Sequence, residues 1–277
     1  MAKWRLGRRL RELREHAGVT IAEAAREAGI NAGTVSKIES GKQACKTAFV
    51  NLWGRMYGLT DDERAELAVL AAEAQQPGWW SNYSKSVPDW FRLAVAYESE
   101  ASTIFTYEAS LVPGLFQTAA TARALALANW PDAAPDDVDR QVELRAMRQQ
   151  RLFDADPPTV RAILDEAVLM RPVGGDAVFA AQIAHLIEMA KLPHISIRVL
   201  PFSAGAHPAM TAPFLMLGFD AEPGMDTVYL ENGRGSVYLD APADRAMYAD
   251  KFHRLELLAC GHGETEGRLS SLRAQYL

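Results

Sequence analysis

The histidines and cysteines are the residues that most readily bind metals or act as nucleophiles. The chain contains His16, His185, His194, His207, His253, His262, Cys45 and Cys260. None of them forms an HxH, HxxxH or CxxC pattern, the spacings that bring two ligands to one side of a metal ion. The sequence therefore predicts neither a metal site nor a bound cofactor.

Motifs that would indicate an enzyme are also missing from the sequence. The glycines at Gly33 and Gly174-Gly175 lack the Lys-Ser/Thr of a phosphate-binding loop and the spacing of a dinucleotide-binding fingerprint. No serine lies within a GxSxG sequence, so a hydrolase nucleophile elbow is not supported. We therefore predict no catalytic residues and expect the protein not to be an enzyme.

Two stretches are candidates for binding a ligand or a partner protein. An aromatic cluster contains Trp79, Trp80 and Trp90, and could form a ligand cage or simply pack as structural anchors, which we favour. The small-residue loop 203–208 contains His207, whose imidazole can titrate near neutral pH. The alternative for this loop is an ordinary turn with a solvated histidine.

Two carboxylates follow an expected strand and precede an apolar run. These are Asp165 and Glu166. A partly buried carboxylate needs a hydrogen-bonding or cationic partner, and Arg161 or Arg171 could supply it. We interpret this pair as structural rather than as a binding site.

The stretch from Gly18 to Lys42 has two short helical patterns joined by a glycine-containing turn. Thr20 with Glu23 three residues later is the sequence of a capping box. Gly29 is placed to end that helix in the left-handed conformation, and a second helix is expected from Ala32 to Ser40. This arrangement predicts a helix-turn-helix, whose second helix enters the major groove of DNA.

The helical period separates the buried side of that second helix from its exposed side. Val35 and Ile38 point inward, which leaves the small and polar residues toward solvent or DNA. Neighbouring basic residues suit phosphate contacts. The residues expected to contact DNA are Thr20, Asn31, Ala32, Gly33, Thr34, Ser36, Lys37, Lys42, Lys46, Arg5, Arg8 and Arg9. The alternative is a small helical bundle with a solvated basic face.

Charge is distributed unevenly along the chain. Residues 1–60 hold eleven Lys and Arg against five Asp and Glu, a net charge of +6, so the remainder must carry −12 to give the total of −6. A basic first part suits phosphate binding, whereas an acidic second part is repelled by DNA and suits another partner.

The elements that position these residues fall into two parts. Apolar spacing from Leu6 to Ala17, the helix-turn-helix and two later helices predict an all-α domain of five helices over residues 1–75. Residues 79–277 predict an α+β domain with a predominantly antiparallel sheet. Its strands are expected at 103–107, 159–164, 195–200, 214–219, 227–231 and 236–239, and its helices at 117–129, 135–153, 176–191, 242–259 and after 263.

Length and composition agree with a cytoplasmic globular protein. With 277 residues and 49% hydrophobic residues, the chain can bury one or two cores. Two cysteines do not make a disulfide framework, and neither a signal-like start nor the roughly 20-residue apolar run of a membrane span occurs.

Residues 6–58 resemble the Xre (Cro/CI-type repressor) helix-turn-helix family. The resemblance is carried by Thr20, Ala25, Gly29, Ile30 and the string TVSKIESGK from Thr34 to Lys42. It implies a five-helix DNA-binding domain. Many members carry a phosphate-contacting Gln directly after the cap of the second helix, where this chain has Ile21, so we expect modest sequence specificity.

Residues 79–277 resemble the C-terminal domain of actinobacterial WhiJ-like regulators. The similar strings are WWSNYSKSVPDWF, PGLFQTAATARAL, LDEAVLMRPVGG, LPFSAGAHP and VYLENGRGSVYLD. The resemblance implies a transcriptional regulator or antitoxin-like protein, often encoded beside a small partner protein, and supplies no catalytic residues.

Together these features lead to one main hypothesis and two alternatives. The main one is a sequence-specific DNA-binding transcriptional regulator that acts as a homodimer on double-stranded DNA, with an acidic domain that dimerises and binds an effector or a partner protein. The first alternative is an antitoxin-like module that sequesters a small neighbouring protein, with DNA binding serving autoregulation. The second is a small-molecule-sensing repressor, which an apolar pocket would favour.

Overall fold

The computed structural model describes residues 2–75, 89–220 and 224–276, without the side chains of residues 89 and 90. The chain divides into two compact units, residues 1–81 and 82–277. Each unit is described by itself.

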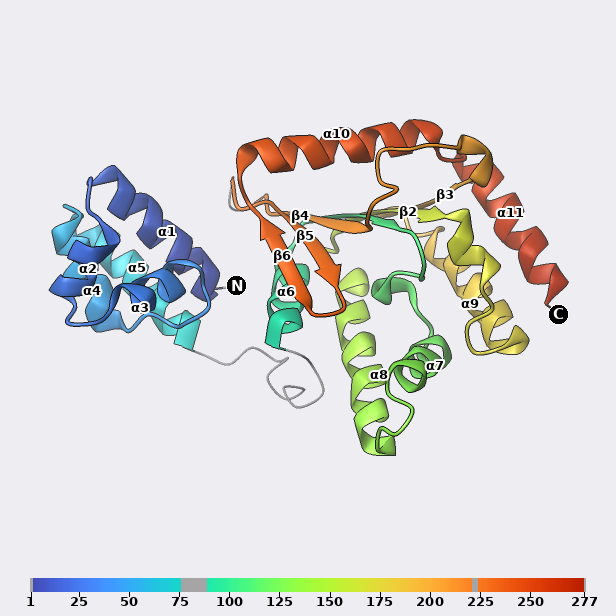
Figure 1. Cartoon of the computed structure of the whole chain (residues 1–277), viewed down its shortest axis with the longest axis horizontal. Helices are drawn as coiled ribbons and strands as arrows, with labels where there is room; N and C mark the ends of the chain where they lie inside the picture. Colours follow the sequence, from blue (N-terminus) through green and yellow to red (C-terminus); the bar gives the residue numbers. More distant parts are fainter. Residues whose placement is uncertain (1, 76–88, 221–223, 277) are drawn as a thin grey trace. The chain divides into compact units, whose positions relative to one another are not determined.

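Five helices make up the first unit, as predicted (Figure 1). They are α1 (Ala2–His16), α2 (Ile21–Glu27), α3 (Ala32–Glu39), α4 (Thr47–Met56) and α5 (Asp61–Gln75). The capping box at the start of α2 is formed in both directions between Thr20 and Glu23, and Gly29 has the expected left-handed backbone, with φ of +65°. Local sequence therefore determines where the helices of the helix-turn-helix begin and end.

Apolar residues from all five helices form the core of this unit. Leu6 and Leu10 of α1, Val35 and Ile38 of α3, and Trp53 of α4 are fully or almost fully buried. The indole Nε1 of Trp53 donates a hydrogen bond of 2.8 Å to the carbonyl of Ala24. This bond satisfies the one polar group of a large side chain in the core and joins α4 to α2.

A six-stranded mixed sheet forms the centre of the second unit. The strands are β1 (Thr103–Glu108), β2 (Thr159–Asp165), β3 (Ile195–Leu200), β4 (Phe214–Gly218), β5 (Thr227–Asn232) and β6 (Gly235–Leu239), in the order β3-β2-β1-β4-β5-β6. The pairs β1–β2 and β2–β3 are parallel, and the other three are antiparallel. The parallel pairs occur where helices connect consecutive strands, because parallel strands need a crossover. The α+β class is confirmed.

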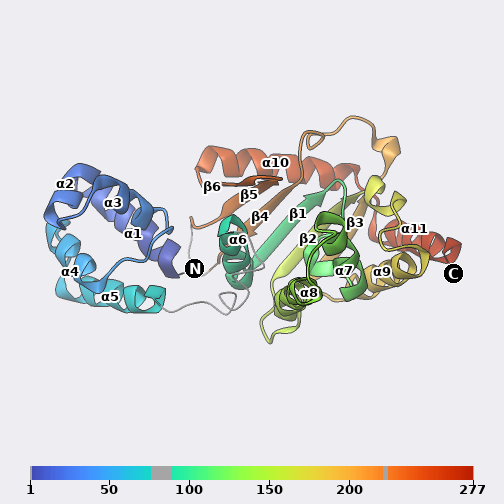
Figure 2. The same ribbon diagram turned by 60° about the horizontal axis from the view of Figure 1, so that its bottom comes forward.

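Helices cover both faces of this sheet. They are α6 (Asp89–Glu100), α7 (Ala119–Asn129), α8 (Pro135–Gln150), α9 (Asp176–Met189), α10 (Pro242–Leu258) and α11 (His262–Gln275). Figure 1 shows α10 along one face, with α6, α8 and α9 on the other, and Figure 2 shows α7 and α8 in front of the sheet with α10 behind it.

Helix boundaries differ from the predicted ones by a few residues. The expected helix at 117–129 begins at Ala119, because the Thr118 hydroxyl accepts the backbone N–H of Thr121 and caps the helix there. A short 3-10 turn, η2 (Gly114–Phe116), precedes it. The expected helix at 135–153 is helical to Gln150 and then tightens into a 3-10 turn over 151–153.

Candidate nucleic-acid interface and ligand pocket

Helix α3 presents the outward face that its sequence predicted. Val35 and Ile38 are buried against the core, whereas Ala32, Ser36 and Lys37 are exposed. Because the buried residues recur at helical spacing, the exposed ones share the opposite side of the helix. This face is short, and Ser36 and Lys37 are its polar side chains within the helix.

Two of the predicted contact residues also cap helices. The Asn31 side-chain oxygen accepts the backbone N–H of Thr34 at 2.8 Å and the Thr34 hydroxyl at 3.0 Å. Thr20 caps α2 through the backbone N–H of Glu23 at 3.2 Å. These bonds fix the ends of α2 and α3 and occupy the acceptor of Asn31. Its amide N–H groups are left for a partner.

A buried ion pair holds α3 against α1. The Arg14 guanidinium donates to both carboxylate oxygens of Glu39, with Nε to Oε1 at 2.6 Å and the second contact at 3.0 Å. It also donates to the carbonyl of Val19 in the turn before α2, at 2.9 Å. Hydrogen bonding to Glu39 raises the pKa of Arg14. One side chain therefore links the two helices of the DNA-binding motif to α1.

Gly7 of α1 allows α1 and α3 to approach each other closely. A Cβ at this position would lie 2.2 Å from the carbonyl oxygen of Ile38 and 2.9 Å from that of Glu39. Both atoms are backbone, so they cannot rotate away. Gly7, Arg14 and Glu39 were not predicted as functional, although a glycine inside a helical pattern is a recognised sign of close packing.

The predicted basic contacts differ in their surroundings. Lys37, Lys42, Lys46 and Arg9 are exposed. Arg8 is half-buried: its Nε donates to Glu12 at 3.0 Å, and its guanidinium lies 5.8 Å from the centroid of the Trp4 ring. Arg9 also pairs with Glu12, at 3.9 Å, but its side chain is 58% exposed. The exposed residues are therefore more accessible to phosphates than Arg8 is.

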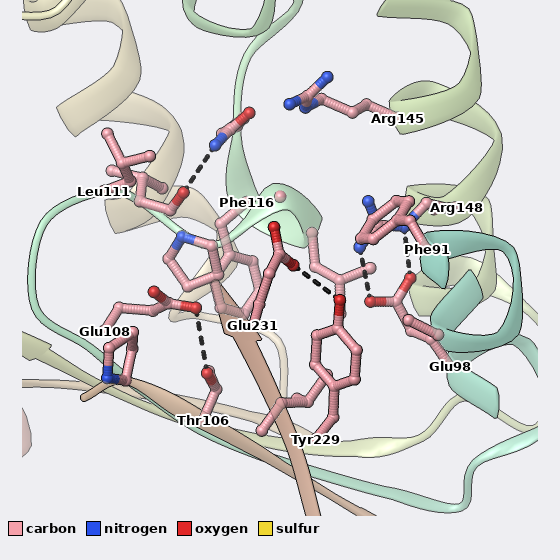
Figure 3. A pocket seen from close by; sticks show the side chains of 18 of the residues that line it. Phe91, Glu98, Thr106, Glu108, Leu111, Phe116, Arg145, Arg148, Tyr229 and Glu231 are labelled. Atoms are coloured by element: carbon pink, nitrogen blue, oxygen red, sulfur yellow. Dashed lines mark hydrogen bonds and ion pairs between the residues drawn. The ribbon is translucent and has the colours of Figure 1, made fainter. Parts of the chain in front are cut away.

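A pocket of about 680 Å³ lies in the second unit, on the sheet face opposite α10 (Figure 3). Alternation along β1 defines this face: Ile104, Thr106 and Glu108 line the pocket, whereas Phe105 stacks on Phe252 of α10. The apolar part of the wall includes Phe91, Leu111, Leu115, Phe116 and Trp130.

Two arginines of α8 face the pocket in different states. Arg148 makes a bidentate ion pair with Glu98 of α6, at 2.7 and 2.8 Å. Arg145 makes no hydrogen bond or ion pair to any described residue, and its Nε is buried without a partner. In Figure 3 its guanidinium reaches toward the pocket from α8. Burial, followed by the neighbouring charge of Arg148, lowers the pKa of Arg145 to about 10.

The sheet contributes two carboxylates to the same pocket. Glu231 lies at the exposed end of β5 and accepts the Tyr229 hydroxyl at 2.8 Å. Glu108 ends β1 and lies 3.3 Å from the Thr106 hydroxyl. Burial raises the pKa of Glu108 to about 8. At neutral pH Glu108 is therefore mainly an uncharged acid. The pocket also contains the buried side-chain oxygen of Gln117, which accepts no hydrogen bond from any described residue.

His207 is not among the residues that line this pocket. It packs against the Tyr107 ring, with Nε2 3.5 Å from the tyrosine oxygen, and its Nδ1 accepts the backbone N–H of Ala209. The side chain is 8% exposed, so the alternative of a solvated histidine is wrong. The residues Trp79 and Trp80, and the side chain of Trp90, lie outside the described residues.

The two carboxylates after β2 have structural partners, but not the predicted ones. Glu166 pairs with Arg268 at 3.3 Å and accepts the backbone N–H of Phe202 at 2.6 Å. Asp165 accepts the Tyr107 hydroxyl at 3.2 Å. The expected partner Arg161 instead pairs with Glu256, because strand alternation turns it toward α10.

Residues 2–75, 89–220 and 224–276 contain no group of three or more His, Cys, Asp or Glu side chains arranged to hold a metal. Both cysteines are buried and unpaired. Burial raises the pKa of Cys45 to about 12, so this thiol stays protonated at neutral pH.

Comparison with known families agrees with this division into two parts. Residues 5–67 match a model described as a helix-turn-helix domain, which supports a DNA-binding regulator. Residues 91–271, most of the remaining chain, match a model described as a domain of unknown function, DUF5753. The chain therefore belongs to the DUF5753 family. Searches of curated proteins and of solved structures gave no match.

No helix in the described part of the chain has both the length and the apolar character needed to cross a bilayer.

Proposed function

We propose that this protein is a sequence-specific transcriptional regulator of the Xre type, which binds operator DNA through α3 and is controlled through its second unit. The observation that carries the proposal is the exposed face of α3, held in place by the buried Arg14–Glu39 pair. The net charge of +6 on residues 1–60 gives the attraction to phosphates that such binding needs.

The test is operator binding by a Lys37→Ala variant. The operator is first selected from random DNA with the full-length protein. Loss of Lys37 should weaken operator binding about tenfold, and the decrease of affinity with salt should become shallower if Lys37 contacts a phosphate. Lys191→Ala, which removes an exposed lysine from the second unit, is the matched control and should bind as the wild type does. Unchanged affinity of Lys37→Ala at several salt concentrations would refute the assignment of α3.

We also propose that the regulator acts as a homodimer. The exposed face of α3 is small, and two such faces reading half-sites about one turn of DNA apart, roughly 34 Å, reach useful affinity. Sedimentation equilibrium gives the mass in solution, and footprinting gives the half-site spacing. A monomer that protects a single half-site would contradict this part of the proposal.

For the second unit we propose regulation by an effector, because the pocket has the size of a small-molecule site and holds polar groups on two sides. We propose that the effector is bound and not converted. Glu98 and Arg148, two charged residues of the pocket, pair with each other and are therefore not free to act on a ligand. Chromosomal DNA as the target supports a cytoplasmic location.

A partner protein is the second candidate for control. The resemblance to WhiJ-like, antitoxin-like regulators supports it, and Leu257 of α10 is 72% exposed on the same acidic unit. Co-purification of a stoichiometric small protein, together with an operator affinity that changes when it is removed, is the expected result. Equal affinity with and without that protein would argue against coupling.

A further inference from the structure

We propose that the pocket between α8 and the sheet binds a mainly apolar organic acid with a single negative charge, and that Arg145 is its anion partner. This inference rests on the proposed role of the second unit as an effector domain and names the chemical class of the effector.

The state of Arg145 points to an anion. A half-buried guanidinium is costly unless it is paired, and Arg148 three residues later shows the usual solution, a bidentate pair with Glu98. Arg145 has no such pair in the described part of the chain, and its buried Nε has no acceptor. The carboxylate of Glu231 attracts Arg145 across the pocket but makes no ion pair with it, and accepts the Tyr229 hydroxyl. An anionic ligand would complete the environment of Arg145.

The rest of the wall calls for an apolar body. A volume of about 680 Å³ lies within the roughly 300–1,000 Å³ of small-molecule sites. Leu115 and Phe116 are buried, whereas Leu111 and Trp130 are exposed apolar side chains of the lining. Burial of an aromatic or alicyclic ligand against them supplies binding energy that inorganic anions cannot gain.

The other polar groups limit the ligand to one negative charge. Glu231 would repel a second anionic group, and Glu98 is already neutralised by Arg148. Burial raises the pKa of Glu108 and favours its protonated form, which can hydrogen-bond a neutral group. The Gln117 amide donates to the Val112 carbonyl at 2.7 Å, which leaves its buried oxygen to accept from a hydroxyl or N–H of the ligand.

The experiment compares two dyes that share an aromatic body and differ in charge. 8-Anilinonaphthalene-1-sulfonate carries one sulfonate, and N-phenyl-1-naphthylamine lacks it. Fluorescence titration and calorimetry of the full chain should show one sulfonate dye bound per chain. Arg145→Gln should weaken the sulfonate dye at least tenfold and the neutral dye less than twofold. Arg140→Gln is the control on the same helix, because Arg140 pairs with Asp137 and does not line the pocket.

A pH series adds a second readout. The other charged side chains that line the pocket are Glu231, Arg145, Arg148 and Glu98. Ionisation of Glu108 would add a negative charge, so binding of the sulfonate dye should weaken severalfold between pH 7 and 9. Glu108→Gln should remove that change.

Dye binding tests the pocket alone, whereas operator binding tests the proposed DNA-binding function. No stoichiometric binding of either dye would overturn the pocket as a ligand site, and equal affinities of wild type and Arg145→Gln for the sulfonate dye would overturn the anion role. Circular dichroism melting shows whether each variant is folded, so that dye binding to unfolded protein can be recognised. Because the titrations contain no DNA, Lys37→Ala should bind the dye normally even where it fails on the operator.

Discussion

Replacement of Arg14 by methionine tests how the DNA-binding motif is held together. The side chains of Arg14 and Glu39 are only 8% and 5% exposed. Removal of the guanidinium leaves a buried carboxylate without a counter-charge, which costs about 3–5 kcal/mol. The carbonyl of Val19 loses its donor as well, for about 1 kcal/mol more. Domains are stable by only about 5–15 kcal/mol. Arg14→Met should therefore lose about 4–6 kcal/mol, a large part of the free energy of unfolding of the first unit.

A double-mutant cycle separates the value of the pair from the cost of breaking it. Arg14→Met with Glu39→Met replaces both charges by apolar side chains of similar length, and such replacements are often neutral or stabilising. We expect the double variant to regain most of the stability lost by Arg14→Met. Hydrogen exchange of the α3 amides in the full chain measures the free energy of opening of this motif independently of the second unit.

The control for this cycle lies on the same helix. Arg11 pairs with Glu15 at 2.9 Å, but the two side chains are 59% and 52% exposed. Arg11→Met should change the free energy by less than about 1 kcal/mol, as exposed pairs do. If Arg14→Met costs no more than Arg11→Met, the argument that burial makes the Arg14–Glu39 pair indispensable is refuted.

Three further predictions concern packing and charge. Gly7→Ala should cost about 1–3 kcal/mol and weaken operator binding, because its methyl group would displace the α3 backbone; melting and DNA titration measure both effects. The folded state raises the pKa of Glu108 from 4.5 to about 8 and so keeps a proton that the unfolded state loses. The stability of the second unit should thus fall by about 3–4 kcal/mol between pH 5 and 8, and Glu108→Gln should flatten this dependence in urea denaturation. Arg145→Met should stabilise that unit by about 1–3 kcal/mol in the same urea denaturation assay, and it should weaken anion binding.

The helix-turn-helix could be predicted because its signals are local. Thr20 and Glu23 are three residues apart, and Gly29 acts on its own backbone, so no knowledge of distant contacts is needed. The Arg14–Glu39 pair, in contrast, joins residues 25 apart. Both also fit the exposed, charged pattern of ordinary surface helices, and only the packing of α1 on α3 shows that they are buried.

The pocket could not be predicted because its parts come from separate regions of the chain. Glu98 precedes β1, Arg148 belongs to a crossover helix, and Glu231 comes from β5, which the sheet order places two strands from β1. One signal was visible in β1. This strand is covered by helices on both faces, yet Thr106 and Glu108 alternate with Phe105 and Tyr107, and polar residues on one face of a buried strand indicate a site.

The arginines of the two units show how structure and function make different demands on a buried charge. Arg14 and Arg148 each meet a carboxylate from another helix, so their pairs orient those helices at little net cost to stability. Arg145 is half-buried, its Nε has no hydrogen-bond partner, and no carboxylate pairs with it in the described part of the chain, so we expect it to lower stability without positioning any element. A structural role would be served better by a leucine or methionine at this position, whereas recognition of an anion needs a charge that is left unpaired. The expected cost of this unpaired charge is therefore the physical argument for our proposal that Arg145 serves ligand binding rather than the fold.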